Sequence, residues 1–149
     1  MKKRIMIQQD KCVGCLNCSA ACMNAHRTGG PAIFALNMQD RSNPPRNKIY
    51  QKEGKYYPLF CRNCDDPDCV KTCMSGALRK DKETGLVEYD PQKCAACYMC
   101  VMMCRYGHPR PDLERRTVIR CTYCQDTEGK EPACVKACPA EAITVGEET

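Results

Sequence analysis

The chain has 149 residues, of which 16 are cysteine and none is tryptophan. Its formal net charge of +5 counts every thiol as neutral, whereas a metal-bound cysteine is a thiolate, so the basic balance is weak support for a nucleic-acid partner. No stretch approaches the ~20 apolar residues of a membrane span, and the N-terminal sequence MKKRIMIQQDK has no apolar run of the kind that an export signal needs. We therefore expect a cytoplasmic protein with no nucleic-acid partner and no direct membrane insertion.

Large apolar residues for a core are few. The chain contains only two phenylalanines, Phe34 and Phe60, and a chain this poor in large apolar side chains usually needs a staple such as a metal or disulfides. The cysteine content of about 11% exceeds the ~8–10% typical of a disulfide scaffold, but in a reducing cytoplasm a cysteine-dense chain more often binds metal. We therefore expect the cysteines to lie at the centre of the fold.

The cysteines fall into four groups of four, and none is left over. Groups one and three share the spacing C-x2-C-x2-C-x3-C, whereas groups two and four share C-x2-C-x(4 or 9)-C-x3-C and both contain C-V-K-x-C. This alternation indicates duplication of one supersecondary unit. In chain order the groups are Cys12, Cys15, Cys18 and Cys22; Cys61, Cys64, Cys69 and Cys73; Cys94, Cys97, Cys100 and Cys104; and Cys121, Cys124, Cys134 and Cys138.

The segments around the groups predict only short elements. A strand-like run precedes group one, in IMIQQDK, and another precedes group three, in LVEYDPQK. Helices should be short and begin around the last cysteine of each group, because the metal-binding turns leave little room for longer elements. The remaining predictions are a hairpin over 48–60 that turns at Glu53-Gly54, a hairpin over 77–90 that turns near Thr84-Gly85, and a surface loop over 105–120 that leads into a strand at Thr117–Ile119.

The spacing of groups one and three favours iron–sulfur clusters over zinc or disulfides. Their C-x2-C-x2-C segment presents three sulfurs from one tight loop, and in the bacterial two-cluster pattern the fourth cysteine ligates the other cluster. A structural zinc site instead uses two C-x2–4-C pairs separated by a longer loop, which would leave Cys18 and Cys100 crowded. Disulfides need an oxidising compartment, and bonds between adjacent cysteines of a loop would constrain little.

The order and spacing of the four groups are similar to those of the four-cluster ferredoxin-like electron-transfer subunits. This family includes the small subunits of dimethyl sulfoxide reductase, formate dehydrogenase, formate hydrogenlyase and carbon monoxide dehydrogenase systems. The resemblance covers nearly the whole chain and implies an α+β fold of two bacterial-type double-cluster modules, with short helices and short antiparallel hairpins around four [4Fe–4S] clusters. Each cluster with its thiolates would carry about −2, which would bring the net charge of the loaded chain to about −3.

The resemblance also implies a ligand set in which the fourth cysteine of each group ligates the cluster of another group. The inner module is then 61–104, the outer module combines 1–22 with 105–149, and 23–60 is a connector with a hairpin. The implied ligands are Cys12, Cys15, Cys18 and Cys138 for cluster 1; Cys22, Cys121, Cys124 and Cys134 for cluster 2; Cys61, Cys64, Cys69 and Cys104 for cluster 3; and Cys73, Cys94, Cys97 and Cys100 for cluster 4.

The chain departs from the family pattern after the fourth cysteine of three groups, where a proline is usual. Only Cys138 is followed by proline, Pro139, while Met23, Met74 and Arg105 occupy the other three places. Arg105 is either a cation that raises the potential of the neighbouring cluster or an ordinary solvated arginine.

Other residues near the groups have both a functional and an ordinary interpretation. The apolar residues of group three either exclude water from a cluster or simply fill the core, and the lysines of the C-V-K-x-C segments are expected to be solvated. The histidines are potential metal ligands, but with sixteen thiols available we expect both in exposed loops. These residues are Tyr98, Met99, Met102 and Met103; Lys71 and Lys136; and His26 and His108.

The sequence contains no motif for catalysis, such as a glycine-rich phosphate loop or a Ser/His/Asp arrangement. With four thiolates for every cluster, no iron keeps an open position for a substrate, so we expect an electron-transfer subunit without a catalytic site. The resemblance points to a wire between a redox enzyme, in first place carbon monoxide dehydrogenase, and an electron acceptor. The alternatives are a subunit of a soluble formate dehydrogenase or hydrogenase assembly, a free polyferredoxin, and a zinc-bound interaction module.

Overall fold

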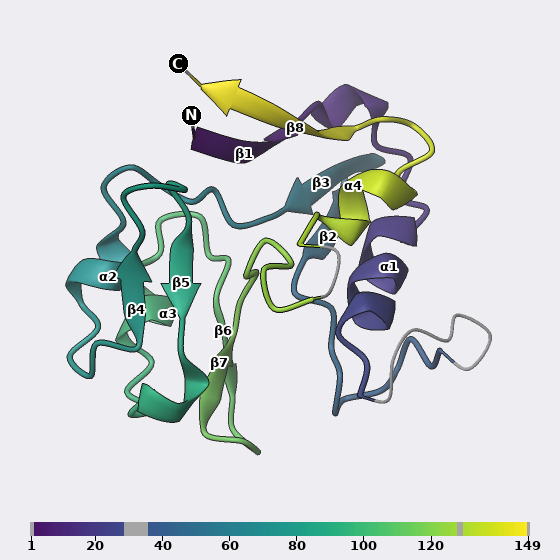
Figure 1. Ribbon diagram of the computed structural model, residues 1–149. Coiled ribbons are helices and arrows are strands. Elements are labelled where there is room, and N and C mark those ends of the chain that lie inside the picture. The colour runs from purple at the N-terminus through teal and green to yellow at the C-terminus, as the bar shows by residue number, and fades with distance from the viewer. Residues whose placement is uncertain (1, 29–35, 128–129, 149) are drawn as a thin grey trace. The chain divides into compact units, whose positions relative to one another are not determined.

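The computed structural model describes residues 2–28, 36–127 and 130–148. These residues form short helices and two-stranded sheets (Figure 1), which confirms the predicted α+β fold. None of the helices in these ranges is both long and apolar enough to cross a lipid bilayer. In chain order the elements are β1 (Lys2–Ile7), η1 (Gln9–Lys11), α1 (Asn17–Ala25), β2 (Lys48–Lys52), β3 (Lys55–Leu59), α2 (Asp68–Lys71), β4 (Leu78–Lys80), β5 (Val87–Tyr89), η3 (Pro91–Lys93), α3 (Met99–Met103), β6 (Arg110–Asp112), β7 (Thr117–Ile119), α4 (Ala133–Ala137) and β8 (Ile143–Glu148).

The chain divides into two compact units. Unit 1 comprises Met1–Arg4, Cys61–Thr122 and Gly146–Thr149, and unit 2 comprises Ile5–Phe60 and Tyr123–Val145. The predicted inner module, 61–104, lies within unit 1, which also contains residues 105–122. The described part of the predicted connector lies within unit 2, and residues 29–35 of that connector lie outside the described residues.

Unit 1 contains two antiparallel hairpins, β4–β5 and β6–β7, and the helices α2 and α3, which contact each other. The buried side chains of Leu78, Val87, Cys100 and Val118 form its hydrophobic core. Several predicted ligands pack against this core as partly buried neighbours: Cys69, Cys73 and Cys94. The thiols therefore contribute to the packing of unit 1, as the shortage of large apolar residues led us to expect.

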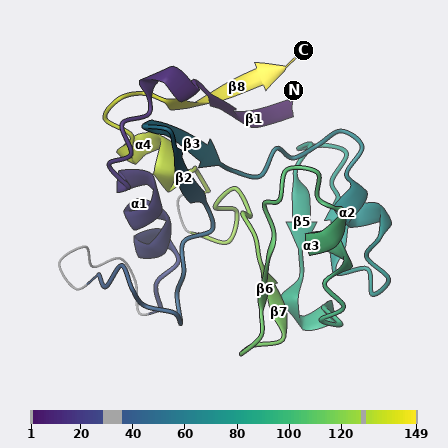
Figure 2. The same ribbon diagram turned by 180° about the vertical axis from the view of Figure 1, so that it is seen from behind.

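Unit 2 contains the hairpin β2–β3 and the helices α1 and α4, which lie side by side in both views (Figures 1 and 2). Its two largest fully buried side chains are Phe60 and Met23, each 1% exposed. Cys22, Cys124 and Cys134 are buried as well. As in unit 1, thiols make up a substantial part of a small core.

The duplication seen in the sequence is also present in the backbone. Strand β4 follows group two and pairs with β5, which precedes group three; likewise β8 follows group four and pairs with β1, which precedes group one. The Asp90 N–H donates to the Ala77 carbonyl at 2.9 Å, and the equivalent Gln8 N–H donates to the Ala142 carbonyl at 2.7 Å. Groups two and three thus share one repeat, and groups four and one share the other.

The hairpin predictions are confirmed, whereas the predicted helix starts are wrong. Strands β2 and β3 pair in the predicted hairpin with Lys52 opposite Lys55, strands β4 and β5 form the second hairpin, and β7 matches the predicted strand. The partner strand β6, within the predicted surface loop, was not expected. Each helix begins one residue before the third cysteine of its group, because the C-x3-C spacing is that of one helical turn.

Candidate iron–sulfur centres

The C-x2-C-x2-C loops of groups one and three have the same unusual backbone. In group one, Gly14 and Leu16 adopt φ of 69° and 62°, and at the equivalent positions of group three Ala96 and Tyr98 adopt 55° and 57°. This left-handed region is unfavourable for residues with a side chain, so it persists only where the surrounding structure enforces it. The repetition shows that both loops need the same tight reversal, which brings the cysteines of a loop together.

Groups two and four repeat a second backbone pattern. Asn63, between the first two cysteines of group two, has φ of 44°, and its equivalent Tyr123 has φ of 58°. After the fourth cysteine, the Ala142 N–H donates to the Cys138 sulfur at 3.4 Å. Burial acts to raise the pKa of Cys73, but backbone hydrogen bonds from Leu78, Ser75 and Ala77 and the Ser75 hydroxyl together outweigh it and lower the pKa. Such hydrogen bonds to sulfur are one of the levers on cluster potential.

One pocket in unit 2 is lined by all four residues proposed for cluster 1. Cys12, Cys15 and Cys18 come from the group-one loop, and Cys138 comes from the last group. Burial raises the pKa of Cys18 to about 11, and the neighbouring thiols of Cys15 and Cys12 act in the same direction. The rest of the wall is mainly apolar and consists of Val13, Gly14, Leu16, Ile49, Pro58, Ala140, Ala142 and Ile143. Four converging thiols in an apolar wall fit a [4Fe–4S] cluster, which takes four thiolate ligands.

The residues proposed for cluster 3 lie near one another in unit 1. Burial raises the pKa of Cys64, and the thiols of Cys61 and Cys104 contribute in the same direction. Burial also raises the pKa of Cys69, with contributions from the same two thiols. As thiolates these cysteines would repel one another, and a bound metal would supply the compensating positive charge.

Three of the four residues proposed for cluster 4 are also brought together in unit 1. Cys100 is buried, Cys73 and Cys94 pack against the same core, and Cys97 of the same loop is exposed. Burial raises the pKa of Cys100 to about 11, and the thiols of Cys69 and, less strongly, Cys94 act in the same direction. The hydroxyl of Tyr89 bonds to Cys94 and to the Val118 N–H, so β5 and β7 both meet at this site.

The residues proposed for cluster 2 fall on both sides of the unit boundary. Cys22, Cys124 and Cys134 are buried in unit 2, where α1 packs on α4. Burial raises the pKa of Cys124, and the Cys22 thiol adds to this effect. Cys121, the fourth residue proposed for cluster 2, belongs to unit 1.

All sixteen cysteines lie in the described ranges and none forms a disulfide. Within these ranges, no three His, Cys, Asp or Glu side chains stand close enough to share one metal ion, whereas a [4Fe–4S] cluster binds its four thiolates through four separate iron atoms.

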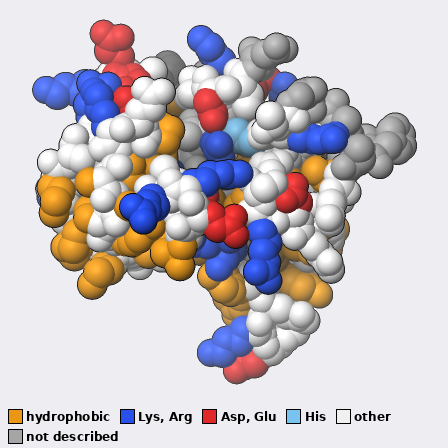
Figure 3. All heavy atoms as spheres, turned by 90° about the horizontal axis from the view of Figure 1, so that it is seen from below, with side chains coloured by type: hydrophobic (Ala, Val, Ile, Leu, Met, Phe, Trp, Pro, Cys, Tyr) orange, Lys and Arg blue, Asp and Glu red, His pale blue; other side chains and the backbone are white. Residues whose placement is uncertain are grey.

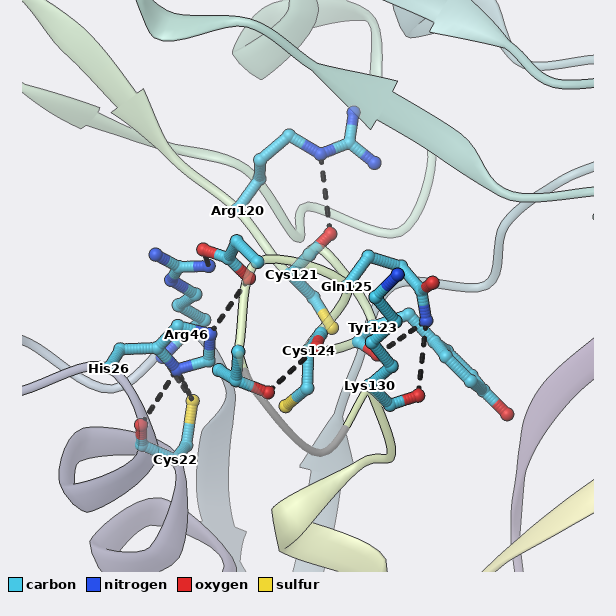
Figure 4. Close-up of polar contacts among 11 residues, drawn as sticks. Cys22, His26, Arg46, Arg120, Cys121, Tyr123, Cys124, Gln125 and Lys130 are labelled. Atoms are coloured by element: carbon cyan, nitrogen blue, oxygen red, sulfur yellow. Dashed lines mark hydrogen bonds and ion pairs between the residues drawn. The ribbon is translucent and has the colours of Figure 1, made fainter. Parts of the chain in front are cut away.

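The expectation that His26 lies in an exposed loop is wrong. Its side chain is 7% exposed, and it caps α1, where Nδ1 is 2.8 Å from the Cys22 carbonyl oxygen and 3.9 Å from the Cys22 sulfur (Figure 4). Nε2 lies 3.2 Å from Asp126, which also binds Arg46. Burial acts to lower the pKa of His26, but Asp126 and the Cys22 thiol outweigh it and raise the pKa to about 9. His26 is therefore a cation at neutral pH beside a proposed ligand.

The same expectation is wrong for His108, which is 4% exposed. Its Nε2 accepts a hydrogen bond of 2.9 Å from the Cys121 N–H. Burial, with the nearby positive charge of Arg120, lowers the pKa of His108 to about 3. The ring is therefore neutral and can accept this bond, which fixes the backbone at the first cysteine of group four.

The charged residues singled out in the sequence are mostly solvated. Lys71 and Lys136 are exposed and form ion pairs with Asp66 and Glu131, as expected for solvated lysines. The Arg105 side chain is 64% exposed and binds Asp68 through Nη2 at 2.8 Å. The carboxylate offsets much of the Arg105 charge, which favours the ordinary interpretation of this residue.

Two of the methionines of group three are exposed rather than buried. Met102 and Met103 are 76% and 44% exposed, so for them both water exclusion and core packing are wrong. They follow Cys100 on the short helix α3 (Met99–Met103), in which Cys100 is the buried residue. Tyr98 does pack against the core, and its hydroxyl donates to the Asp112 carbonyl. After the fourth cysteines, Met23 is fully buried and Met74 is 75% exposed.

The sequence did not lead us to predict a role for Arg120 or Lys80, which both contact the cysteine loops. Arg120 is 3% exposed, and its Nη2 donates to the Cys61 sulfur at 3.4 Å. A signal was present, because Arg120 follows the buried Val118 at the period of two that places strand residues on one face. Lys80 donates to the backbone carbonyls of Asn63, Cys64 and Gly85 at 2.7–3.0 Å. The same signal was present here, because Lys80 lies two residues after the buried Leu78, whereas Arg79 between them is exposed.

Comparisons with known proteins show the family of the chain. Residues 52–148 match the family described as 4Fe-4S dicluster domain. The probable anaerobic dimethyl sulfoxide reductase chain YnfG of Escherichia coli is 33% identical over 94% of this chain and 71% of its own length. The protein NrfC homolog of Haemophilus influenzae is 32% identical over 98% of this chain and 65% of its own length.

A solved structure shares the fold. A chain of the active site complex BamBC of benzoyl coenzyme A reductase, in complex with zinc, matches 99% of this chain and 79% of its own length with a TM-score of 0.52 and 25% identity. Fold, thiol loops and relatives together define a ferredoxin-like iron–sulfur protein. The chain belongs to the 4Fe-4S dicluster family, among the electron-transfer subunits of the dimethyl sulfoxide reductase type, which are not the catalytic subunits of their complexes.

Proposed function

We propose that this chain is an electron wire that holds four [4Fe–4S] clusters in two double-cluster modules, with the ligand set implied by the sequence resemblance. The observation that carries the proposal is the pocket that Cys12, Cys15 and Cys18 share with Cys138. When bound, each cluster supplies transfer of one electron without bond changes at the protein. The residues of the chain hold the clusters, shield them with apolar walls and set the charges and hydrogen bonds around them.

The backbone repeat supports the pairing of groups into modules. The pair β4–β5 connects groups two and three, and β8–β1 connects groups four and one. Exchange of the fourth cysteine within each pair places Cys73 and Cys104 in one module, and Cys22 and Cys138 in the other. In this arrangement each pair of clusters crosslinks segments that are far apart in the sequence, which is how a chain with a small core gains stability.

Replacing Cys138 with serine tests the exchanged ligand set. We expect the variant to lose cluster 1 and hence about four of about sixteen iron atoms per chain. Because Cys15 and Cys138 would serve the same cluster, the double variant Cys15→Ser/Cys138→Ser should lose no more iron than Cys138→Ser alone. Iron content and electron paramagnetic resonance of anaerobically purified protein measure both results.

The matched comparison is the double variant Cys124→Ser/Cys138→Ser. Since Cys124 is assigned to cluster 2, the two iron losses should add. If this pair instead behaves as one site and Cys15→Ser/Cys138→Ser is additive, Cys138 ligates within its own group and the exchange is wrong.

A wire subunit needs a surface for its redox partner. In unit 1 the exposed large apolar side chains include Met74, Met102, Met103, Tyr106 and Leu113, and hydrophobic side chains gather on one part of the face drawn in Figure 3. Exposed apolar patches mark interaction sites, and methionine and tyrosine are enriched at interfaces. These residues support a subunit that docks on a redox enzyme.

The sequence resemblance puts forward carbon monoxide dehydrogenase as the partner enzyme, or a formate dehydrogenase or hydrogenase assembly. The relatives add an enzyme of the anaerobic dimethyl sulfoxide reductase type to these candidates. We propose a cytoplasmic setting, because sixteen free thiols must stay reduced until clusters are inserted. Purification of the native complex from its cell distinguishes a wire subunit, which elutes with its enzyme, from a free polyferredoxin, which elutes alone.

A further inference from the structure

Arg120 is a buried cation whose surroundings are thiols. It lies in unit 1, immediately after β7, and is 3% exposed. Its Nη2 donates to the Cys61 sulfur at 3.4 Å. Its Nε donates to the Cys121 carbonyl at 3.4 Å (Figure 4). Burial acts to lower the pKa of Arg120, but the sulfurs of Cys61, Cys69 and Cys121 act to raise it.

A buried guanidinium normally needs an anion. Its burial would be unfavourable beside neutral groups, and an uncompensated buried charge is strongly destabilising. Nη1 of Arg120 is buried and has no hydrogen-bond partner among the described residues. Arg120 is thus a charged donor with spare hydrogen-bonding capacity that already donates to a cysteine sulfur. Thiolates that ligate a cluster would supply the missing negative charge.

Two of the three thiols belong to the same proposed site. Cys61 and Cys69 are both assigned to cluster 3, and both form side-chain hydrogen bonds with Arg120. The third contact, to Cys121, is made mainly by the backbone carbonyl. Cys100 of cluster 4 also feels the positive charge, but it is not a hydrogen-bond partner. The charge and the side-chain hydrogen bonds of Arg120 therefore act mainly on the proposed ligands of cluster 3.

We propose that Arg120 is a positioning residue that sets the reduction potential of cluster 3, raising it above the value that the four thiolates alone would give. The inference rests on the proposed function. Reduction adds one electron to the cluster, with no proton transferred and no bond to a ligand changed, so the negative charge increases by one. A fixed cation stabilises the more negative state, and hydrogen bonds to the ligand sulfurs act in the same direction.

This role distinguishes Arg120 from Arg105, the arginine that stands out in the sequence. Both lie near cluster 3, but Arg105 is exposed and its charge is offset by Asp68. Water and the carboxylate screen Arg105, whereas Arg120 acts through a low-dielectric interior. Arg105→Ala is therefore a matched control that removes the same charge near the same site.

The experiment is an anaerobic redox titration of the whole holo-protein with dithionite and mediators, followed by electron paramagnetic resonance. Dithionite supplies the electron and is itself oxidised. Arg120→Met should lower one midpoint potential so that the ratio of reduced to oxidised cluster falls at least tenfold at a given applied potential, which is about 59 mV for one electron. Arg120→Lys should retain most of the wild-type potential, since it retains the charge. The component that moves should be the one altered in Cys64→Ser.

Each outcome has one meaning. A wild-type sample without iron and sulfide would refute the proposed function itself. Wild-type protein with clusters, together with a fully loaded Arg120→Met that titrates like wild type, would overturn only the role of Arg120. The same follows if Arg105→Ala produces an equal shift. If Arg120→Met, Arg120→Gln and Arg120→Lys all lose the iron of cluster 3, Arg120 is a structural residue and the inference is also overturned.

Discussion

At the scale of single residues, the group-one loop depends on one position, Gly14, where a side chain does not fit. Gly14 has φ of +69°, and a Cβ added to it would lie 2.3 Å from Cε1 of Tyr56. Tyr56 lies on β3, so the contact fixes the group-one loop against the β2–β3 hairpin within unit 2. The glycine is thus required both by its backbone conformation and by the aromatic ring packed upon it.

Gly14→Ala should therefore destabilise the protein more than alanine at another left-handed glycine. Left-handed backbone costs alanine about 1–2 kcal/mol, and the clash with Tyr56 adds roughly 1–3 kcal/mol. Gly76→Ala is the control, because Gly76 has φ of +70° and open space around its Cα. Anaerobic thermal unfolding and iron content compare the two variants.

The double variant Gly14→Ala/Tyr56→Ala isolates the steric part of this effect. Removing the ring should restore part of the stability that Gly14→Ala loses relative to Tyr56→Ala. Equal losses in Gly14→Ala and Gly76→Ala, with no rescue in the double variant, would show that the Tyr56 contact is unimportant.

At this scale the cysteine spacing singled out sixteen thiols as ligand candidates, and their assignment to individual clusters stays a prediction. The residues around the thiols were predicted poorly. His26 and His108 were expected in exposed loops, because their burial arises from contacts distant in the sequence, with Asp126 for His26 and the Cys121 N–H for His108. Arg120 was one of several arginines in an Arg- and Pro-rich segment, and only its register with Val118 pointed inward.

At the scale of elements, a short hairpin supports the group-two cysteine loop. Lys80, on β4, donates to three carbonyls, of which those of Asn63 and Cys64 belong to the group-two loop. Asn63 accepts a 3.1 Å hydrogen bond from the Val87 N–H on β5. The β4–β5 hairpin therefore holds the loop that carries Cys61 and Cys64.

Lys80→Met should loosen this loop. The three carbonyls would lose their charged donor, and each buried polar group left unpaired costs about 1–3 kcal/mol. Arg79→Met is the matched control. It removes the same charge from the same strand, but Arg79 is exposed. We expect lower stability and faster loss of iron to a chelator in Lys80→Met only. Similar iron-loss rates in the two variants would contradict a supporting role for Lys80.

The elements themselves were predictable where local signals were strong. Alternating residues around Glu53-Gly54 and around Thr84-Gly85 gave both hairpins. The pairing of β1 with β8 was not predicted, because it joins the two ends of the described chain and depends on the duplication. Strand β6 was missed since Arg110–Asp112 contains a proline, which usually argues against a strand.

At the scale of the whole molecule, the chain consists of two copies of one structural unit, in which thiols take the place of many of the large apolar side chains of an ordinary core. Each repeat contributes a strand pair, two short helices in contact and two cysteine groups. Long-range pairing of β1 with β8 completes the second repeat from both ends of the sequence. This organisation explains why the sequence predicted the family and the α+β fold, while the ligand exchange stays a proposal that needs its own test.

The central claim is that four [4Fe–4S] clusters occupy the cysteine groups. Iron and acid-labile sulfide, measured per chain on anaerobically purified protein, test it most directly. We expect a brown protein with about sixteen iron atoms and about sixteen sulfide ions per chain. A folded, colourless protein that contains zinc, or no metal at all, would contradict it.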